Sequence, residues 1–268
     1  MSSKEFEREG MVGDKELVES KEKWENRVGD DGKNDYYTDI LLNKKPGPVT
    51  AKIVIFFVFF VIGLIQGYQN VIILDLQERG GSYDDQALFT FSNYPYFLKI
   101  FQAPFVDAYY LSNFGKCRTY IVITYLLISL MIFAIAPSSD SFIQPSNIVP
   151  LTCFWTFNSF VLVFAVIAGE MWIVKILDDE DKGKGSILLD LGMSVGIFLS
   201  YNIFIPLNSV KWLNDNIFTT SPVTKPLVSH SALLIFIAST SLLTGLFILV
   251  FIAEKVSPTA ENPSFVGS

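Results

Sequence analysis

The stretch Ile53–Leu74, "IVIFFVFFVIGLIQGYQNVIIL", decides the fold class. It carries no charge, and its roughly 22 residues are enough for a helix that crosses about 30 Å of hydrocarbon. A helix that is apolar on all sides can also lie in the core of a soluble protein. One chain rarely holds several such helices, so the number of similar stretches decides between the two interpretations.

Five further apolar stretches follow, each about 18 to 23 residues long and therefore able to span a bilayer as a helix. They are Gln86–Val106, Thr119–Ala136, Leu151–Ile173, Ser186–Pro206 and Ala232–Ile252. The connections between them carry charges or helix breakers, as in "QERGGSYDD" and "LDDEDKGKG", and none is long enough for a soluble domain. The sequence predicts an all-α membrane protein with six transmembrane helices in a lipid bilayer.

The two ends of the chain differ in composition from its middle. Residues 1–50 are acidic, mixed in charge and poor in apolar residues, which predicts a disordered tail. Residues 51–253 form the expected six-helix domain, and residues 254–268 a short second tail. With both tails in the cytoplasm, the inner faces would hold Lys44, Lys45, Lys52, Lys116, Arg118, Lys175, Lys182, Lys184 and Lys255. The outer faces would hold only Arg79, Lys211 and Lys225, so the excess of basic residues predicts two cytoplasmic termini.

Three charged residues fall inside the expected spans: Lys99 in the second, Glu170 near the end of the fourth and Asp190 near the start of the fifth. A charge at this depth is costly, so it usually faces a cavity or a partner of opposite charge. We expect Lys99 to face an internal cavity, to pair with Glu170 or Asp190, and to receive an anionic substrate when that carboxylate moves away. The alternative is that Lys99 extends its aliphatic stem to the membrane interface.

Proline and glycine residues shape two of the expected helices. Pro95 and Pro104 bracket Lys99, and each removes a backbone donor, which predicts a twice-bent second helix. In the fifth span, Gly192 and Gly196 form a small-xxx-small pattern that allows close packing of helices.

Several classes of function find no support in the sequence. There is no Ser-His-Asp set, HExxH motif or phosphate-binding glycine loop, so we expect no enzyme, cofactor or metal site. Cys117 and Cys153 lie in different segments without ligand spacing. The single histidine, His230, is interpreted as an interfacial residue at a membrane boundary and not as a proton carrier. Nothing in the charge pattern indicates nucleic-acid binding.

The segment "APFVDAYYLSNFGKCRTYIV", which begins at Ala103, resembles the loop between the second and third helices of the major facilitator superfamily. Asp107, Gly115, Lys116 and Arg118 match that signature, with "AYYLSN" inserted between the aspartate and the glycine. This lengthened form, together with "LIQGYQNVIILDLQERGGSYDDQALFTFSNYPYFLKIFQAP" before it, is similar to the acetyl-coenzyme A transporter family.

The resemblance implies the N-terminal half of a major facilitator fold and a carrier that moves acetyl-CoA, or a similar anionic solute, into the endoplasmic reticulum. It also implies that Lys99 belongs to the substrate pathway and that Asp107, Gly115, Lys116 and Arg118 form a cytoplasmic gate. The family shows a Gln-Asp pair in its fourth helix, where this chain has Ala165 and Val166.

The family has about twelve helices in two halves, with the substrate bound between them. Six helices leave three alternatives open: a fragment, a half that pairs with a second copy or a companion, or a relative that does not transport and acts as a membrane interaction protein.

Overall fold

The structure is a computed structural model that describes residues 48–109, 115–177, 181–219 and 223–252. Within these ranges the chain forms helices and turns, and no β-strand. Five helical segments there are long and apolar enough to cross a membrane: Val49–Glu78, Lys116–Phe142, Pro145–Lys175, Gly183–Asn208 and His230–Phe251. The expected all-helical membrane protein is confirmed at this level. Both tails expected to lie in the cytoplasm fall almost wholly outside the described residues.

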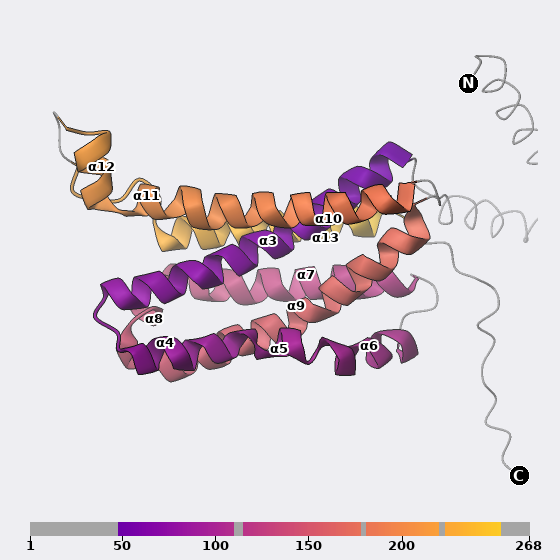
Figure 1. Ribbon diagram of the computed structural model, residues 1–268, viewed down its shortest axis with the longest axis horizontal. Helices are drawn as coiled ribbons and strands as arrows, with labels where there is room; N and C mark the ends of the chain where they lie inside the picture. The colour runs from indigo at the N-terminus through magenta and orange to yellow at the C-terminus, as the bar shows by residue number, and fades with distance from the viewer. Residues whose placement is uncertain (1–47, 110–114, 178–180, 220–222, 253–268) are drawn as a thin grey trace, which may run out of the picture. The chain divides into compact units, whose positions relative to one another are not determined.

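Helix α3 (Pro48–Glu78) packs most extensively against α10 (Lys182–Ile197) (Figure 1). A Cβ atom added to Gly192 would lie 2.5 Å from the carbonyl oxygen of Phe56, and one added to Gly196 would lie 2.7 Å from the backbone nitrogen of Leu64. The facing glycines of α3 are Gly63 and Gly67. The two backbones are in direct contact at Gly192 and Gly196, as a small-xxx-small pattern allows. After α10, the chain continues through a π-helical stretch, Phe198–Ile203, into α11 (Phe204–Asn208) and α12 (Val210–Asn216).

Helix α7 (Lys116–Ile135) lies against both α9 (Ile148–Ile176) and α13 (His230–Phe251). The short turns η2 (Ala136–Ser138), α8 (Ser139–Phe142) and η3 (Pro145–Asn147) connect α7 to α9. Two buried hydroxyls tie α7 to its neighbours. Tyr125 donates to the carbonyl of Val58 in α3, and Ser129 donates to the carbonyl of Ala238 in α13 at 2.9 Å. Such hydroxyls satisfy backbone acceptors across helices where no water is present.

The second expected span, Gln86–Val106, is not one continuous helix. The structure divides this region into α4 (Tyr83–Thr90), η1 (Phe91–Asn93), α5 (Tyr94–Phe97) and α6 (Lys99–Ala108), all of which contact α9. Helix α4 starts with a capping box, in which Ser82 and Asp85 each bond the other's backbone N–H. Six long apolar helices were predicted and five are present among the described residues, because the region of the second expected span is divided into helices that are each too short to cross a membrane alone.

Proline explains the first of these breaks. Pro95 has no N–H to give to the carbonyl of Phe91, and the N–H of Tyr94 bonds that carbonyl instead, in a tighter 3₁₀ turn. The chain breaks again at Leu98, whose ψ of 5° lies outside the α-helical range. Pro104 lies inside α6, which continues through it to Ala108. The breaks thus fall at Phe91–Asn93, next to Pro95 as predicted, and at Leu98. Helix α6 is continuous at Pro104, so the second break does not lie at the predicted proline, and Lys99 is the first residue of α6.

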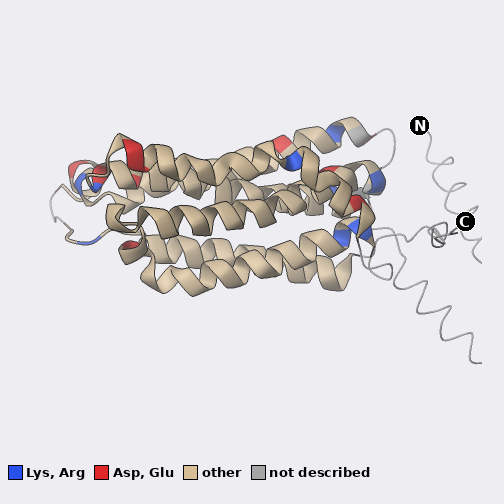
Figure 2. Cartoon of the chain, turned by 90° about the horizontal axis from the view of Figure 1, so that it is seen from below, with Lys and Arg blue, Asp and Glu red and all other residues tan. Residues whose placement is uncertain are grey.

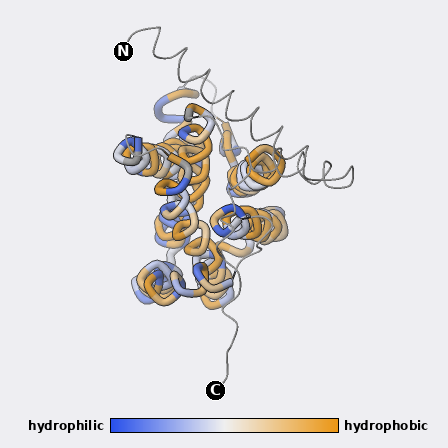
Figure 3. Tube along the Cα trace, turned by 90° about the vertical axis from the view of Figure 1, so that its right-hand side faces the viewer, coloured by the Kyte–Doolittle hydropathy of each residue, from blue (hydrophilic) through white to orange (hydrophobic). Residues whose placement is uncertain are grey.

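Charged residues gather toward the two ends of the helices, and the middle parts of the long helices contain few of them (Figure 2). Viewed along their axes, the helices consist largely of hydrophobic residues (Figure 3). Large apolar side chains such as Leu130 and Leu243, each 68% exposed, lie on outward faces. This inversion of the soluble pattern suits lipid as the surrounding solvent. The assignment of one end to the cytoplasm stays a prediction.

Candidate functional site

The first candidate site joins the broken segment to α9. Lys99 Nζ lies 2.5 Å from each carboxylate oxygen of Glu170. Lys99 is the first residue of α6, and Glu170 lies about two turns before the end of α9. The pairing predicted from sequence is therefore present, with Glu170 as the partner. The pair is partly open, with 35% of the lysine and 43% of the glutamate side chain exposed.

The position of Lys99 makes a partner necessary. The N-terminal end of a helix carries a partial positive charge, which disfavours a cation at its first residue. Glu170 offsets that charge with two oxygens in a fork around the ammonium group. Asp190, the other predicted partner, is exposed on α10 and forms no ion pair among the described residues. The structure brings Lys99 and Glu170 together and leaves Asp190 outside this site.

Amide side chains buried on the same two elements were not singled out from the sequence. Gln102 lies one turn after Lys99 and is 4% exposed, and Asn158 in α9 is fully buried. None of their four amide nitrogen and oxygen atoms has a hydrogen-bond partner within the described ranges. A buried amide without partners is costly. They were missed because the sequence analysis considered only charged residues inside the expected spans. An amide side chain inside an apolar run would have identified them.

The second candidate site is the junction between α6 and α7. Lys116 Nζ donates to Asp107 Oδ1 at 2.8 Å, and the aspartate is 62% exposed. Gly115 precedes α7 with a φ of 86°, a conformation that favours glycine. The hydroxyl of Tyr120 donates to the carbonyl of Phe105 at 2.9 Å and so fastens α7 to α6. Of the predicted gate residues, the structure thus brings Asp107, Gly115 and Lys116 to one place.

Arg118, the fourth predicted gate residue, has a different position. Its side chain is 8% exposed and donates to the carbonyl of Leu249 in the last turn of α13. A cation at the end of a helix binds carbonyls that have no partner within the helix. Arg118 therefore links α7 to α13, beside the Asp107–Lys116 pair and not within it.

A further link at this end was not expected from the sequence. Asp181, just before α10, lies 2.6 Å from Lys184 and 2.6 Å from Lys52 of α3. Hydrogen bonds from Lys184 and then Lys52 lower the pKa of the Asp181 carboxyl below its ordinary value. The carboxylate therefore ties the start of α3 to the start of α10.

A third polar group lies at the other end of α3. His230 was expected to be interfacial, and it does lie at the start of α13. Its side chain, however, is only 3% exposed and is enclosed by the protein, within reach of Tyr68 and Asp75. The position at a membrane boundary stays a prediction, and the side chain there is covered by protein because α3 and α11 pack against it.

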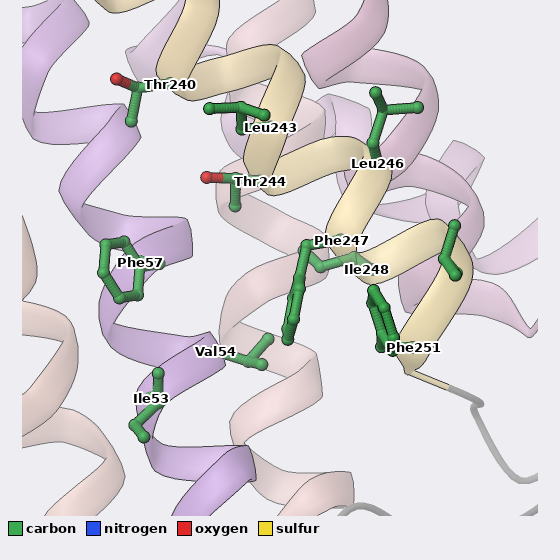
Figure 4. Close-up of a pocket in the computed structure, with 11 residues that line it drawn as sticks. Ile53, Val54, Phe57, Thr240, Leu243, Thr244, Leu246, Phe247, Ile248 and Phe251 are labelled. Atoms are coloured by element: carbon green, nitrogen blue, oxygen red, sulfur yellow. The ribbon is translucent and has the colours of Figure 1, made fainter.

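A cavity of about 600 Å³ lies between α3 and α13 and is lined by apolar side chains (Figure 4). Its hydroxyl groups include that of Thr240, which bonds to the carbonyl of Phe236 in its own helix. None of the described residues that line it is charged. The cavity therefore suits hydrocarbon and offers nothing to a multiply charged ligand. Neither cysteine is in a disulfide, and the described residues hold no group of three metal-binding side chains.

Comparisons with known proteins agree with a membrane transporter. The model of a family described as acetyl-coenzyme A transporter 1 matches residues 53–265. An uncharacterized protein of Schizosaccharomyces pombe is 33% identical over 137 residues, which are 50% of this chain and 26% of that protein. An uncharacterized membrane protein of Saccharomyces cerevisiae is 26% identical over 193 residues, 65% of this chain and 34% of that protein. The matched part thus spans only about a quarter to a third of these relatives. No solved structure matches the chain.

Proposed function

Because the chain belongs to the acetyl-coenzyme A transporter family, we propose that it forms part of a carrier that moves acetyl-CoA, or a related organic anion, across a membrane. The observation that carries this proposal is the Lys99–Glu170 pair, a partly open charge pair inside an otherwise apolar set of helices. Ionisable residues at such depth are usually functional. The activity of a transporter is binding and conformational change, so no bond-making step is assigned to these residues.

The chemistry of the pair suits an anionic substrate. Acetyl-CoA carries several phosphate charges, and a lysine binds phosphate as a compact point charge. In the structure the carboxylate of Glu170 accepts hydrogen bonds from the ammonium group of Lys99. An incoming phosphate would replace the carboxylate, and Glu170 would return when the substrate leaves. The exchange keeps Lys99 paired at every stage, so the site never holds an isolated lysine charge in a medium that solvates it poorly.

The Asp107–Lys116 pair is proposed as a gate at the cytoplasmic side. Both residues are at the surface end of their helices, and the aspartate is largely exposed, so the pair can break and re-form without burying a charge. Arg118 would act beside it by holding the end of α13. A gate needs contacts of this modest strength, because a latch that is too stable would stop the cycle.

The proposal includes the arrangement in the membrane. We propose six spans, with α4 to α6 crossing as one broken segment, the N-terminal half of a major facilitator fold, both termini in the cytoplasm and an endoplasmic reticulum location. Broken segments occur inside membranes where they line a cavity or are covered by protein. The contact of α4, η1, α5 and α6 with α9 supports such a position.

A companion half is part of the same proposal. Helix α10 uses its glycine face against α3, while Ile187 and Leu191 on other faces, and Phe198 directly after the helix, are 50% to 66% exposed. Only 22% of the most apolar window of this span is buried. A second copy or a companion half is proposed to cover part of this surface and to enclose the substrate with Lys99.

The test is uptake of labelled acetyl-CoA into vesicles that contain the purified full chain together with any companion that co-purifies with it. We expect Lys99→Ala to reduce uptake at least about tenfold, since it removes a charge-assisted contact worth roughly 1.5–3 kcal/mol. Lys99→Arg should retain part of the activity, because the charge remains.

Lys184→Ala is the matched control, since Lys184 is an exposed lysine near the same end and is paired with Asp181. Its uptake should stay close to that of the unmodified protein. Unchanged uptake in a correctly inserted Lys99→Ala protein would disprove the role given to Lys99. No uptake by the unmodified chain and its companion would instead favour a membrane interaction protein.

A further inference from the structure

The polar group around His230 lies at the end of α3 remote from Lys99. The hydroxyl of Tyr68 lies 3.2 Å from His230 Nδ1, and His230 Nε2 lies 3.5 Å from Asp75 Oδ1. Tyr68 and Asp75 are two turns apart on one face of α3, while His230 begins α13. Both ring nitrogens therefore lie against α3, with a hydrogen bond at Nδ1 and, among the described residues, none at Nε2.

Aromatic rings enclose this histidine on the inner side. The ring of Tyr68 lies 5.7 Å from that of Trp155, and the ring of Phe204 lies 5.3 Å from the imidazole. On the outer side a polar pocket of about 180 Å³ reaches His230, lined also by Asp75, Glu78, Asn208 and Ser209. The imidazole thus lies between aromatic rings and one polar pocket.

Acidic side chains outnumber basic ones around His230. Within α3, Asp75 lies beside the imidazole and Glu78 lies across the pocket, with the neutral hydroxyl of Tyr68 next to them; α11 contributes the neutral Phe204 and Asn208. Arg79 Nε donates to Asp75 Oδ2 at 2.7 Å, and its Nη1 donates to the carbonyl of Asp140 at 2.9 Å. The Asp140 carboxylate itself is 3.7 Å from Arg79. Asp75 therefore shares one oxygen with Arg79 and offers the other to the imidazole.

This geometry accommodates an imidazole with or without an added proton. In the neutral form one ring nitrogen carries hydrogen, and Tyr68 can donate to Nδ1. After protonation both nitrogens donate, with Nδ1 bonding the Tyr68 oxygen and Nε2 facing Asp75.

We propose that His230 and Asp75 form a proton-binding site, and that the proton is the coupling ion of the carrier. The second part depends on the proposed transport function, whereas the first does not. Protonation strengthens the contact between α13 and α3 at this end, and proton loss weakens it. Since α3 also packs along α10, a proton bound here changes the balance between helix arrangements that the substrate site depends on.

His230 is the only histidine in the chain, so it can be observed alone in the full-length protein, provided that the affinity tag lacks histidine. The experiment is NMR of ¹⁵N-histidine-labelled protein in nanodiscs from pH 8 to pH 5. We expect the neutral signal to convert reversibly to imidazolium. In Asp75→Asn the imidazolium fraction at pH 6 should fall about threefold or more, because a facing carboxylate stabilises the charged form.

Two further variants keep the result decisive. Tyr68→Phe retains the ring packed on Trp155 and removes only the hydroxyl, which can donate to the neutral imidazole or accept from the charged one, so it should change the imidazolium fraction less than Asp75→Asn does. Asp140→Asn is the control, because Asp140 is exposed and reaches this group only through Arg79; it should change the fraction little. A neutral imidazole at every pH, or an equal fraction in all variants, overturns the proton site.

Uptake measurements test whether proton binding is coupled to transport. With the proton site present, an imposed pH gradient should change acetyl-CoA uptake severalfold in the unmodified protein and not in His230→Gln. Uptake that ignores the gradient in both proteins overturns the coupling. Absence of any uptake would count against the proposed function, while the NMR titration would still decide whether His230 and Asp75 bind a proton.

Discussion

The carboxylate of Asp181 shows how a single residue outside the spans holds two helices. It accepts from Lys52 at the start of α3 and from Lys184 in the first turn of α10, and these contacts lower its pKa. A lowered pKa in the folded state stabilises the fold above the ordinary pKa of an aspartate. That contribution disappears as the pH falls through the lowered value.

We expect Asp181→Asn to lower the melting temperature slightly at pH 7, because the Lys52 and Lys184 ammonium groups then face a neutral amide. At a pH below the lowered pKa the two proteins should melt alike. Thermal unfolding in detergent at several pH values measures the difference. A difference that persists unchanged at low pH would show that packing, and not charge, is responsible.

The residues that the sequence singled out for the substrate pathway had one common property, a charge within an apolar stretch. That property found Lys99 and Glu170 because the cost of an unpaired charge is large enough to be visible in composition alone. It gave no way to choose Glu170 over Asp190, since the choice depends on which helix faces α6. Gln102, Asn158 and the pairing of His230 with Asp75 were not predicted, because neutral polar residues, and polar residues near the ends of spans, have a smaller free-energy cost in a membrane.

At the scale of the element, the α3–α10 pair depends on close approach of two backbones. Gly196 and Gly183 lie on the same helix and differ in their surroundings. A Cβ at Gly196 would contact α3, whereas nothing lies within 4 Å of a Cβ at Gly183. The two positions therefore separate the effect of packing from the effect of helix propensity.

Gly196→Ala should destabilise the protein by about 1–3 kcal/mol, because the added methyl group meets main-chain atoms that cannot move aside. Gly183→Ala should change stability by less than about 1 kcal/mol, and in the favourable direction, since alanine is the better helix former. Chemical unfolding in detergent compares the two variants. Equal effects of the two substitutions on the free energy of unfolding would mean that the close contact between α3 and α10 does not contribute to stability.

The broken segment from Tyr83 to Ala108 is the element where prediction was least complete. Hydropathy located it, and the prolines predicted two bends. The structure has its breaks at Phe91–Asn93 and at Leu98, with Pro104 accommodated inside α6. Proline limits which carbonyls can be bonded, but neighbouring helices decide where the chain actually bends.

At the scale of the whole molecule, the proposed companion half predicts an assembly. The chain has a mass of 30.1 kDa. We expect the detergent-extracted native protein to be larger, as a second copy, a companion half or a longer product. Native mass spectrometry with antibodies against both ends distinguishes these three. A single chain that remains monomeric at 30.1 kDa would contradict the proposed companion.

The sequence by itself determined that this is a multi-pass helical membrane protein, which charges lie within it, and its family. These follow from composition along the chain, because lipid accepts only long apolar helices and tolerates few charges. Only the tertiary structure decided that Lys99 pairs with Glu170, that Arg118 holds α13, and that His230 is enclosed beside Asp75. Each of these depends on which faces of distant helices meet, and the uniformly apolar helices carry too little amphipathic pattern to specify that.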